Sequence, residues 1–283
     1  MPNRSTVRVA THLAPGVEPA YALAARRVGE RLGRPAELVV ADDYRRCAAD
    51  LDHVCFVCSV PYLLLANSGS ISMEVLAAPL LRGRRYGRRP VYYSDVIVRS
   101  DGPHRSLADL RGRRWAFNEP YSHSGYLVVL HEAATRLGGG AFLGEAVEAG
   151  FHDQSLRLVL DGTVTWAAID SQVLEIWMRR EPSLRRRLRI VATLGPSTVQ
   201  PVVASRRRLT AGEREAVTRA LTTLHEDRSD RLVLRRAGIS RFVPIGDAAY
   251  ADIRAMLETV ERAGLLPAWW RGRWDSLAPR PAI

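Results

Sequence analysis

Residues 54–59 have the sequence VCFVCS, an almost wholly apolar run that predicts a strand buried on both faces, as in parallel sheets. Two further strand-like runs precede it, at residues 7–10 and 37–41. Apolar residues at helical spacing fill residues 18–32, and Gly33 is placed to end that helix. This alternation of strands and helices predicts an α/β layer fold with right-handed crossovers.

The remainder of the chain repeats this rhythm and predicts a second unit. The length of 283 residues exceeds the ~100–200 residues of one domain. Two long strand-like segments, residues 92–99 and 200–205, each cross between the expected units. We therefore expect two lobes, residues 1–98 with 201–283 and residues 99–200, with a ligand cleft and a hinge between them.

The composition is that of a globular protein and excludes several classes. Hydrophobic residues make up 47% and charged residues 25%, and no apolar run approaches the ~18 residues of a membrane span. All 41 Lys and Arg residues are arginine, which excludes a lysine Schiff base and a P-loop lysine. The sequence also has no dinucleotide fingerprint, nucleophile elbow or metal motif, so we expect no cofactor.

The arginine excess gives a net charge of +11. It reflects either a coding bias toward arginine on the surface or an anionic partner. The arginine runs at residues 82–89 and 185–189 lie in different segments, and only Tyr86 is interleaved with them. This pattern favours a solvated surface, or a rim that steers an anionic ligand, over a nucleic-acid partner.

The three cysteines are Cys47, Cys55 and Cys58. Cys55 and Cys58 have CxxC spacing, but no second Cys/His pair is suitably spaced to complete a zinc site. Buried structural cysteines are therefore favoured over a redox or metal pair, and we expect no metal site.

The most informative local segment is residues 117–126, FNEPYSHSGY, between a predicted strand and a predicted helix. Ser122 and Ser124 offer hydroxyl groups beside the unpaired N–H groups of the first helical turn, where the helix dipole adds partial positive charge. Gly125 lets the backbone come close to a ligand. The segment is suited to a tetrahedral oxyanion; the alternative is an ordinary serine N-cap.

Several motifs resemble the phosphate/phosphite/phosphonate-binding proteins of ABC transporters. The resemblance begins with SLADLRG at 106–112, NEP at 118–120 and SHSGY at 122–126, and it covers about residues 40–260. Later motifs follow in the family's order: GFHD at 150–153, DGTV at 161–164, AAIDS at 167–171, GPS at 195–197, QP at 200–201 and RFVP at 241–244.

The resemblance implies a two-lobed type II periplasmic-binding-protein fold. It also implies a solute-binding protein that closes on a phosphonate-, phosphite- or phosphate-like oxyanion, with an ABC-transporter permease as partner. The residues that would inherit a ligand-binding role are Ser122, His123, Ser124, Tyr44, Tyr93, His152 and Asp170.

Each of these roles has a structural alternative. Tyr44 and Tyr93 could be core aromatics, His152 a hydrogen-bonded loop histidine, and Asp170 the N-cap of the following helix. An aspartate facing an anion would favour a ligand that keeps a proton or carries an amine.

The sequence departs from the family pattern at three points. The family more often has threonine at the position of His123, where a histidine could add a charge-assisted hydrogen bond or act as a pH-sensitive gate. Thr165 stands where an aspartate is usual. Neither a signal peptide nor a lipid-anchor cysteine is recognisable, so we expect a cytoplasmic protein, or an extracytoplasmic one if the N-terminus has been trimmed.

Three functions remain open on the sequence. A binding protein is favoured. The alternatives are a cytosolic enzyme on the same fold, with His123, His152 and Asp170 as acid–base groups, and a cytosolic ligand sensor.

The predicted two-lobed topology implies closure on a ligand, and this can be measured. We expect small-angle scattering to show a more compact molecule when phosphate, phosphite or a phosphonate is added. Calorimetry with the same ligands should give binding heat. An unchanged scattering profile together with blank calorimetry for all three ligand classes would count against a closing oxyanion-binding protein.

Overall fold

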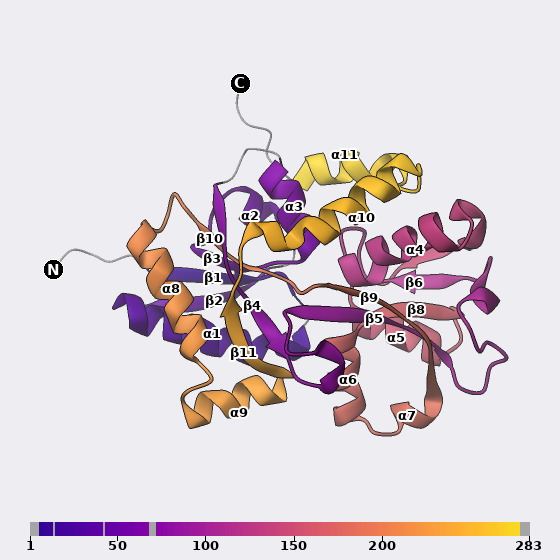
Figure 1. The fold of residues 1–283 in the computed structure, drawn as a ribbon, viewed down its shortest axis with the longest axis horizontal. Coiled ribbons are helices and arrows are strands. Elements are labelled where there is room, and N and C mark those ends of the chain that lie inside the picture. Colours follow the sequence, from indigo (N-terminus) through magenta and orange to yellow (C-terminus); the bar gives the residue numbers. More distant parts are fainter. Residues whose placement is uncertain (1–5, 14, 42, 68–71, 278–283) are drawn as a thin grey trace. The chain divides into compact units, whose positions relative to one another are not determined.

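The computed structural model describes residues 6–13, 15–41, 43–67 and 72–277, which form two compact α/β units (Figure 1). The first unit comprises Met1–Val91, Thr198–Ala251 and Arg271–Ile283, and the second comprises Tyr92–Ser197 and Asp252–Trp270. The chain therefore passes between the units four times, rather than the two times expected from the crossing strands.

The predicted division, residues 1–98 with 201–283 and residues 99–200, stays a prediction, and the observed grouping differs from it most at Asp252–Trp270. Within the second unit the indole N–H of Trp270 donates to the Pro120 carbonyl at 2.8 Å. The Tyr121 hydroxyl donates to the Trp270 carbonyl at 3.0 Å. These contacts join residues about 150 apart in the chain, so no local sequence pattern indicates them.

The first unit is built on a six-stranded sheet with the order β11-β4-β10-β3-β1-β2. Strand β1 pairs in parallel with β2 and β3, whereas β10 pairs antiparallel with β3 and β4. The strands are β1 (Val7–Thr11), β2 (Ala36–Val40), β3 (Val54–Phe56), β4 (Met73–Leu81), β10 (Val202–Ser205) and β11 (Ile239–Pro244).

The apolar run at residues 54–59 is shorter as a strand than expected. Strand β3 ends at Phe56, and Ser59 already begins helix α3. The Val57 N–H still donates across to the Pro201 carbonyl, opposite it in the register with β10, but Pro201 has no N–H to donate in return. The Cys58 carbonyl already accepts from the Tyr62 N–H in the turn into α3. All three residues of β3 are buried, as the absence of polar residues predicts.

Helices α1 and α8 of the first unit pack against each other. The sequence predicts a capping box at Thr210, and it is confirmed: the Glu213 N–H donates to Thr210 Oγ1 at 3.3 Å, and Glu213 Oε2 accepts from the Thr210 N–H at 2.8 Å. The helices are α1 (Glu18–Leu32), α2 (Arg45–Ala48), α3 (Ser59–Asn67), α8 (Ala211–Thr223) and α9 (Arg228–Arg236).

The second unit contains a five-stranded sheet with the order β7-β6-β8-β5-β9. Strand β6 pairs in parallel with β7 and β8, and β5 pairs antiparallel with β8. The strands are β5 (Val91–Arg99), β6 (Trp115–Phe117), β7 (Ala146–Glu148), β8 (Trp166–Asp170) and β9 (Leu188–Thr198). The helices are α4 (Val128–Arg136), α5 (His152–Leu160), α6 (Ser171–Arg180), α7 (Leu184–Arg187) and α10 (Ala251–Arg262), while α11 (Ala268–Leu277) has residues in both units.

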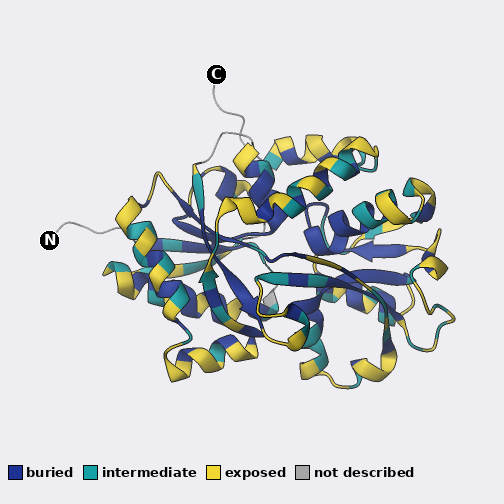
Figure 2. Ribbon diagram, viewed as in Figure 1, coloured by how far each residue is buried: buried dark blue, intermediate teal, exposed yellow. Residues whose placement is uncertain are grey.

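Burial follows the layers within each unit: the central strands are buried, and the helices are exposed along one side (Figure 2). In the second unit the indoles of Trp115 and Trp166 stack with ring centroids 5.0 Å apart. Tyr126 stacks on the Trp115 ring at 6.0 Å. Phe117 and Tyr126 belong to the segment that the sequence singles out for anion binding, and both rings pack on Trp115, so this segment is anchored to the aromatic core.

We expect Trp166→Ala to lower the free energy of unfolding by about 3–5 kcal/mol, because a fully buried aromatic ring is lost and a cavity remains. Trp269→Ala is the matched control, since Trp269 is 47% exposed and its loss should cost about 1 kcal/mol or less. Urea unfolding of both variants measures the difference. Equal losses would show that the Trp115–Trp166 stack does not hold the second unit together.

Candidate functional site

The predicted anion site lies at the start of a helix that follows β6. This helix begins with one turn of π-helix, η4 (His123–Leu127), and continues without a break as α4. Ser122 is extended, and its Oγ accepts from the Gly125 N–H at 3.0 Å. The structural alternative therefore holds for Ser122, which is the N-cap of the helix. Single π-helical turns are rare and are frequently found at functional sites.

Ser124 is held by residues of two other elements in the second unit. Its hydroxyl oxygen and His152 Nε2 are 3.0 Å apart and share a hydrogen bond. The Ser94 hydroxyl, from β5, donates to the Ser124 carbonyl. His152 is the first residue of α5, so segments 28 and 30 residues from Ser124 fix its position. All three side chains are buried.

His123 and His152 are both held neutral at pH 7. Burial, with a smaller contribution from His131, lowers the pKa of His123 to about 3. Burial also lowers the pKa of His152 to about 3. The imidazole of His123 is 1% exposed and lies beside the Tyr92 ring, with the centroids 5.8 Å apart. The structure therefore does not support a charged His123 or a pH gate near neutrality, because too little solvent or counter-charge reaches the ring.

Gly125 is required at its position by close packing. A Cβ there would lie 1.9 Å from Asn118 Oδ1 and 3.2 Å from His152 Cε1. The backbone does come close at Gly125, as the sequence predicts, but the partners observed are protein side chains. Sequence reasoning missed Asn118 as a site residue, although it belongs to the NEP motif at residues 118–120.

Several polar atoms around this helix start are buried without a hydrogen-bond partner among the described residues. They are Asn118 Oδ1, both ring nitrogens of His123, and His152 Nδ1. Buried polar groups in native proteins are nearly always satisfied, so each such group needs an explanation, such as a ligand or an ordered water. Asn118 and His152 meet beside Gly125, and His152 also bonds Ser124, so these residues and the adjacent His123 form the cluster that is the candidate site.

The other residues expected at the site have structural partners. Asp170 caps α6, because its Oδ1 accepts from the Gln172 N–H at 2.7 Å and the Val173 N–H at 3.4 Å. Asp170, at the end of β8, is also the cross-strand neighbour of Ser94 in β5. Ser94 is the residue whose hydroxyl donates to the Ser124 carbonyl, so Asp170 lies one strand away from that hydrogen bond. The Tyr93 N–H donates to Ser171 Oγ at 3.1 Å, and the Tyr93 ring is half-buried.

Tyr44 belongs to the first unit, at the start of α2. It is buried, and its ring stacks on that of His12 with the centroids 5.2 Å apart. The structure therefore describes Tyr44 as a packed aromatic, and a contact between Tyr44 and a ligand stays a prediction.

Comparison with known proteins gives the family. Residues 14–250 match the model of the phosphonate-binding family, described as the periplasmic substrate-binding protein of the phosphonate ABC transporter. The chain belongs to this family. The resemblance noted in the sequence is thereby confirmed. No curated protein matches the chain.

Solved structures agree on the fold. A binding-protein component of an ABC phosphonate transporter from Pseudomonas aeruginosa is 16% identical, with a TM-score of 0.77 over 96% of this chain and 94% of that chain. PhnD1 from Prochlorococcus marinus, in complex with methylphosphonate, is 15% identical, with a TM-score of 0.78 over 91% of this chain and 98% of that chain. A Xanthomonas citri protein bound to ATP is 18% identical, with a TM-score of 0.71 over 93% and 99%. These likenesses confirm the type II periplasmic-binding-protein fold.

The comparisons do not support two of the sequence expectations. The family is described as periplasmic, which does not support the expected cytoplasmic location, and no match favours the cytosolic enzyme. Among the described residues, no helix has both the length and the apolar character needed to cross a membrane.

The neutral state of the two histidines predicts how stability depends on pH. Their folded pKa of about 3 lies below the usual 6.5, so below pH 6.5 the unfolded chain binds protons that the native chain does not. Stability should fall as the pH falls from 6.5 toward 3. Between pH 7.5 and pH 5 each histidine should contribute a loss of about 2 kcal/mol.

His123→Asn should remove one histidine's share of this loss, as measured by urea unfolding at pH 7.5 and pH 5. His104→Asn, in a loop of the same unit, is the control and should leave the difference unchanged. An NMR titration of the ligand-free protein in which His123 becomes charged near pH 6 would contradict the assignment.

Proposed function

We propose that the protein is a solute-binding protein that holds a phosphonate-, phosphite- or phosphate-like oxyanion at the start of η4. The observation that carries this proposal is that both ring nitrogens of His123 and Nδ1 of His152 are buried without a partner within the described part of the chain, because each neutral ring has one N–H to donate. Family membership and the methylphosphonate bound to PhnD1 from Prochlorococcus marinus support the choice of anion.

The chemistry of the cluster suits an anion held by hydrogen bonds. The possible donors are the Asn118 amide N–H groups, the ring N–H of neutral His123, and one of two groups in the Ser124–His152 pair. If neutral His152 donates from Nδ1, its Nε2 accepts the Ser124 proton; if Nε2 carries the proton, the Ser124 hydroxyl is left to donate to the ligand. The backbone N–H groups and the dipole of the helix start add partial positive charge. Ser122 contributes indirectly, because its hydroxyl fixes the first turn through the Gly125 N–H.

Buried neutral donors favour an anion for a further physical reason. An anion brought close to His123 and His152 raises their pKa values, because it stabilises the protonated rings. Part of the ligand's charge could then be offset by proton uptake on binding. The proposal therefore keeps His123 as a hydrogen-bond donor to the anion. Its ring is neutral before the ligand binds, because burial lowers its pKa to about 3.

The roles of Tyr44, Tyr93 and Asp170 as ligand contacts remain part of this proposal and rest on the resemblance. For Asp170 the carboxylate already accepts two backbone N–H groups of α6, so a direct contact would use its remaining lone pairs. We also propose an extracytoplasmic location and an ABC-transporter permease as partner, in keeping with the family description.

The decisive experiment replaces Ser124, which lies in the cluster but caps no helix. Ser124→Ala removes one donor to a charged acceptor, and such bonds contribute ~1.5–3 kcal/mol, so affinity should fall about ten- to a hundredfold. Calorimetry with methylphosphonate, phosphite and phosphate measures this change. ATP belongs in the same panel, because a structural relative from Xanthomonas citri binds it.

Ser155→Ala is the matched control: Ser155 is a fully buried serine of α5 in the same unit, and its Oγ contacts the Phe151 carbonyl at 3.4 Å. The control should bind all ligands as the wild type does. If Ser124→Ala leaves the affinity for every oxyanion unchanged, the η4 site is wrong. If the wild type binds ATP but none of the small oxyanions, the ligand class is wrong.

A further inference from the structure

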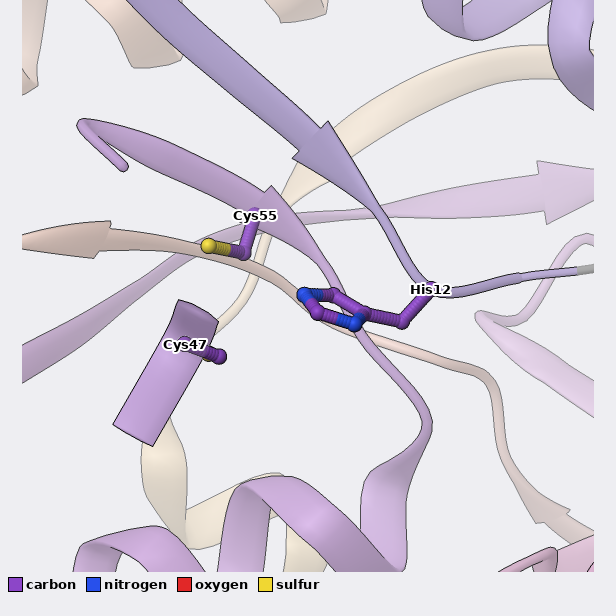
Figure 3. A group of neighbouring side chains, drawn as sticks. All are labelled: His12, Cys47 and Cys55. Atoms are coloured by element: carbon purple, nitrogen blue, oxygen red, sulfur yellow. The ribbon is translucent and has the colours of Figure 1, made fainter. Parts of the chain in front are cut away.

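A second group of chemically reactive side chains lies in the first unit, whereas η4 belongs to the second. His12 follows β1, Cys47 belongs to α2 and Cys55 lies in β3 (Figure 3). Their ligand atoms, one imidazole nitrogen and two Sγ atoms, all lie within 4.8 Å of one another. Parallel pairing of β1 with β3 sets Ala10 opposite Cys55 and so brings the segment after β1 beside this strand.

The three side chains are sheltered from solvent. Cys47 and Cys55 are buried free thiols. His12 is half-buried, and both of its ring nitrogens are buried without a partner in hydrogen-bond geometry among the residues that the structure describes. Figure 3 shows the His12 ring pointing toward Cys55. A buried imidazole without a partner has the same need for an explanation as those at η4.

A fourth soft donor lies next to the cluster. Met73 begins β4, and its Sδ is 4.0 Å from Cys47 Sγ. In a tetrahedral site with metal–sulfur distances near 2.3 Å, neighbouring sulfur ligands lie about 3.8 Å apart. The spacings of 4.0 Å and at most 4.8 Å are therefore within about 1 Å of those of a loaded site.

The donor set also selects the metal. Thiolate and thioether ligands favour Cu⁺ and Zn²⁺, whereas Mg²⁺, Ca²⁺ and Mn²⁺ prefer oxygen. A thioether is typical of copper sites and absent from the common zinc sites, whose ligands are cysteine, histidine and carboxylates. We propose that His12, Cys47 and Cys55, with Met73 as a weaker fourth ligand, bind one thiophilic metal ion, Cu⁺ in preference to Zn²⁺.

This site differs from the zinc motif that the sequence analysis tested. Cys58, the partner of Cys55 in the CxxC spacing, is outside the cluster. The ligands instead come from residues 12, 47, 55 and 73, on two strands, one helix and the segment after a third strand. A bound ion would join these elements, and it would hold the Tyr44 ring that stacks on His12.

The test uses the full, tag-free chain, reduced and stripped of metal with a chelator. Cu⁺ is titrated in competition with a chromophoric Cu⁺ chelator, and Zn²⁺ in competition with a zinc indicator. One equivalent of Cu⁺ should bind. Cys47→Ser, Cys55→Ser and His12→Asn should each weaken binding at least tenfold, and Met73→Leu should weaken Cu⁺ more than Zn²⁺.

Cys58→Ala is the matched control, because Cys58 is a buried cysteine outside the cluster. It should retain one equivalent with wild-type affinity. Equal loss in Cys58→Ala, or no competition by the wild type for either ion, overturns the site. Tighter binding of Zn²⁺ than of Cu⁺ overturns the metal preference.

Two measurements on the wild type guard against variants that fail to fold. Cu⁺ should raise the melting temperature, because ligand binding to the native state alone stabilises it, and chelator should reverse the rise. X-ray absorption of the loaded protein should show two or three sulfur neighbours and one nitrogen. A shell of nitrogen and oxygen only, or a Cys47–Cys55 disulfide that forms under mild oxidation and is unaffected by Cu⁺, would overturn the proposal.

Discussion

The close approach of Gly125 to Asn118 and His152 is the constraint on which the η4 site depends. A Cβ at residue 125 would lie 1.9 Å from Asn118 Oδ1, so only glycine allows the helix start to pack there. Beside this contact, Ser124 Oγ lies 3.0 Å from His152 Nε2, the ring whose Cε1 also faces Gly125. The same packing buries the imidazoles, and burial is what lowers their pKa values to about 3. A side chain at residue 125 would therefore disturb the part of the fold that holds Asn118 and His152 beside the helix start.

A neutral, buried set of donors has consequences for selectivity. Donors fixed by the fold cost little reorganisation when an anion arrives, and a dry site strengthens each hydrogen bond. None of the hydrogen bonds proposed at η4 comes from an arginine, so the net charge of +11 would act on an anion at long range, by steering.

The first unit shows how a returning strand completes a sheet. Strand β10 enters antiparallel between β3 and β4, so β3 is flanked on both edges and its apolar residues are fully buried. Strand β2 is at the edge, and Val40 is 54% exposed there. The side chains of His12, Cys47 and Cys55 meet at the ends of this arrangement, where β1, β3 and α2 come together.

The sequence by itself determined the α/β class, the Thr210 capping box and the helix start at residues 122–126, because all three depend on neighbours within a few residues. The sequence could not show that Asp170 caps α6. It also could not predict the hydrogen bond between Ser124 and His152, which are 28 residues apart. It also could not join residues 12, 47 and 55, since the CxxC spacing pointed to Cys58 instead. Only the tertiary structure decided these contacts. The physical reason is that strand order brings together segments that are far apart in the chain, and so decides which polar groups find a partner. The burial that results lowers the pKa values of His123 and His152 and keeps both rings neutral.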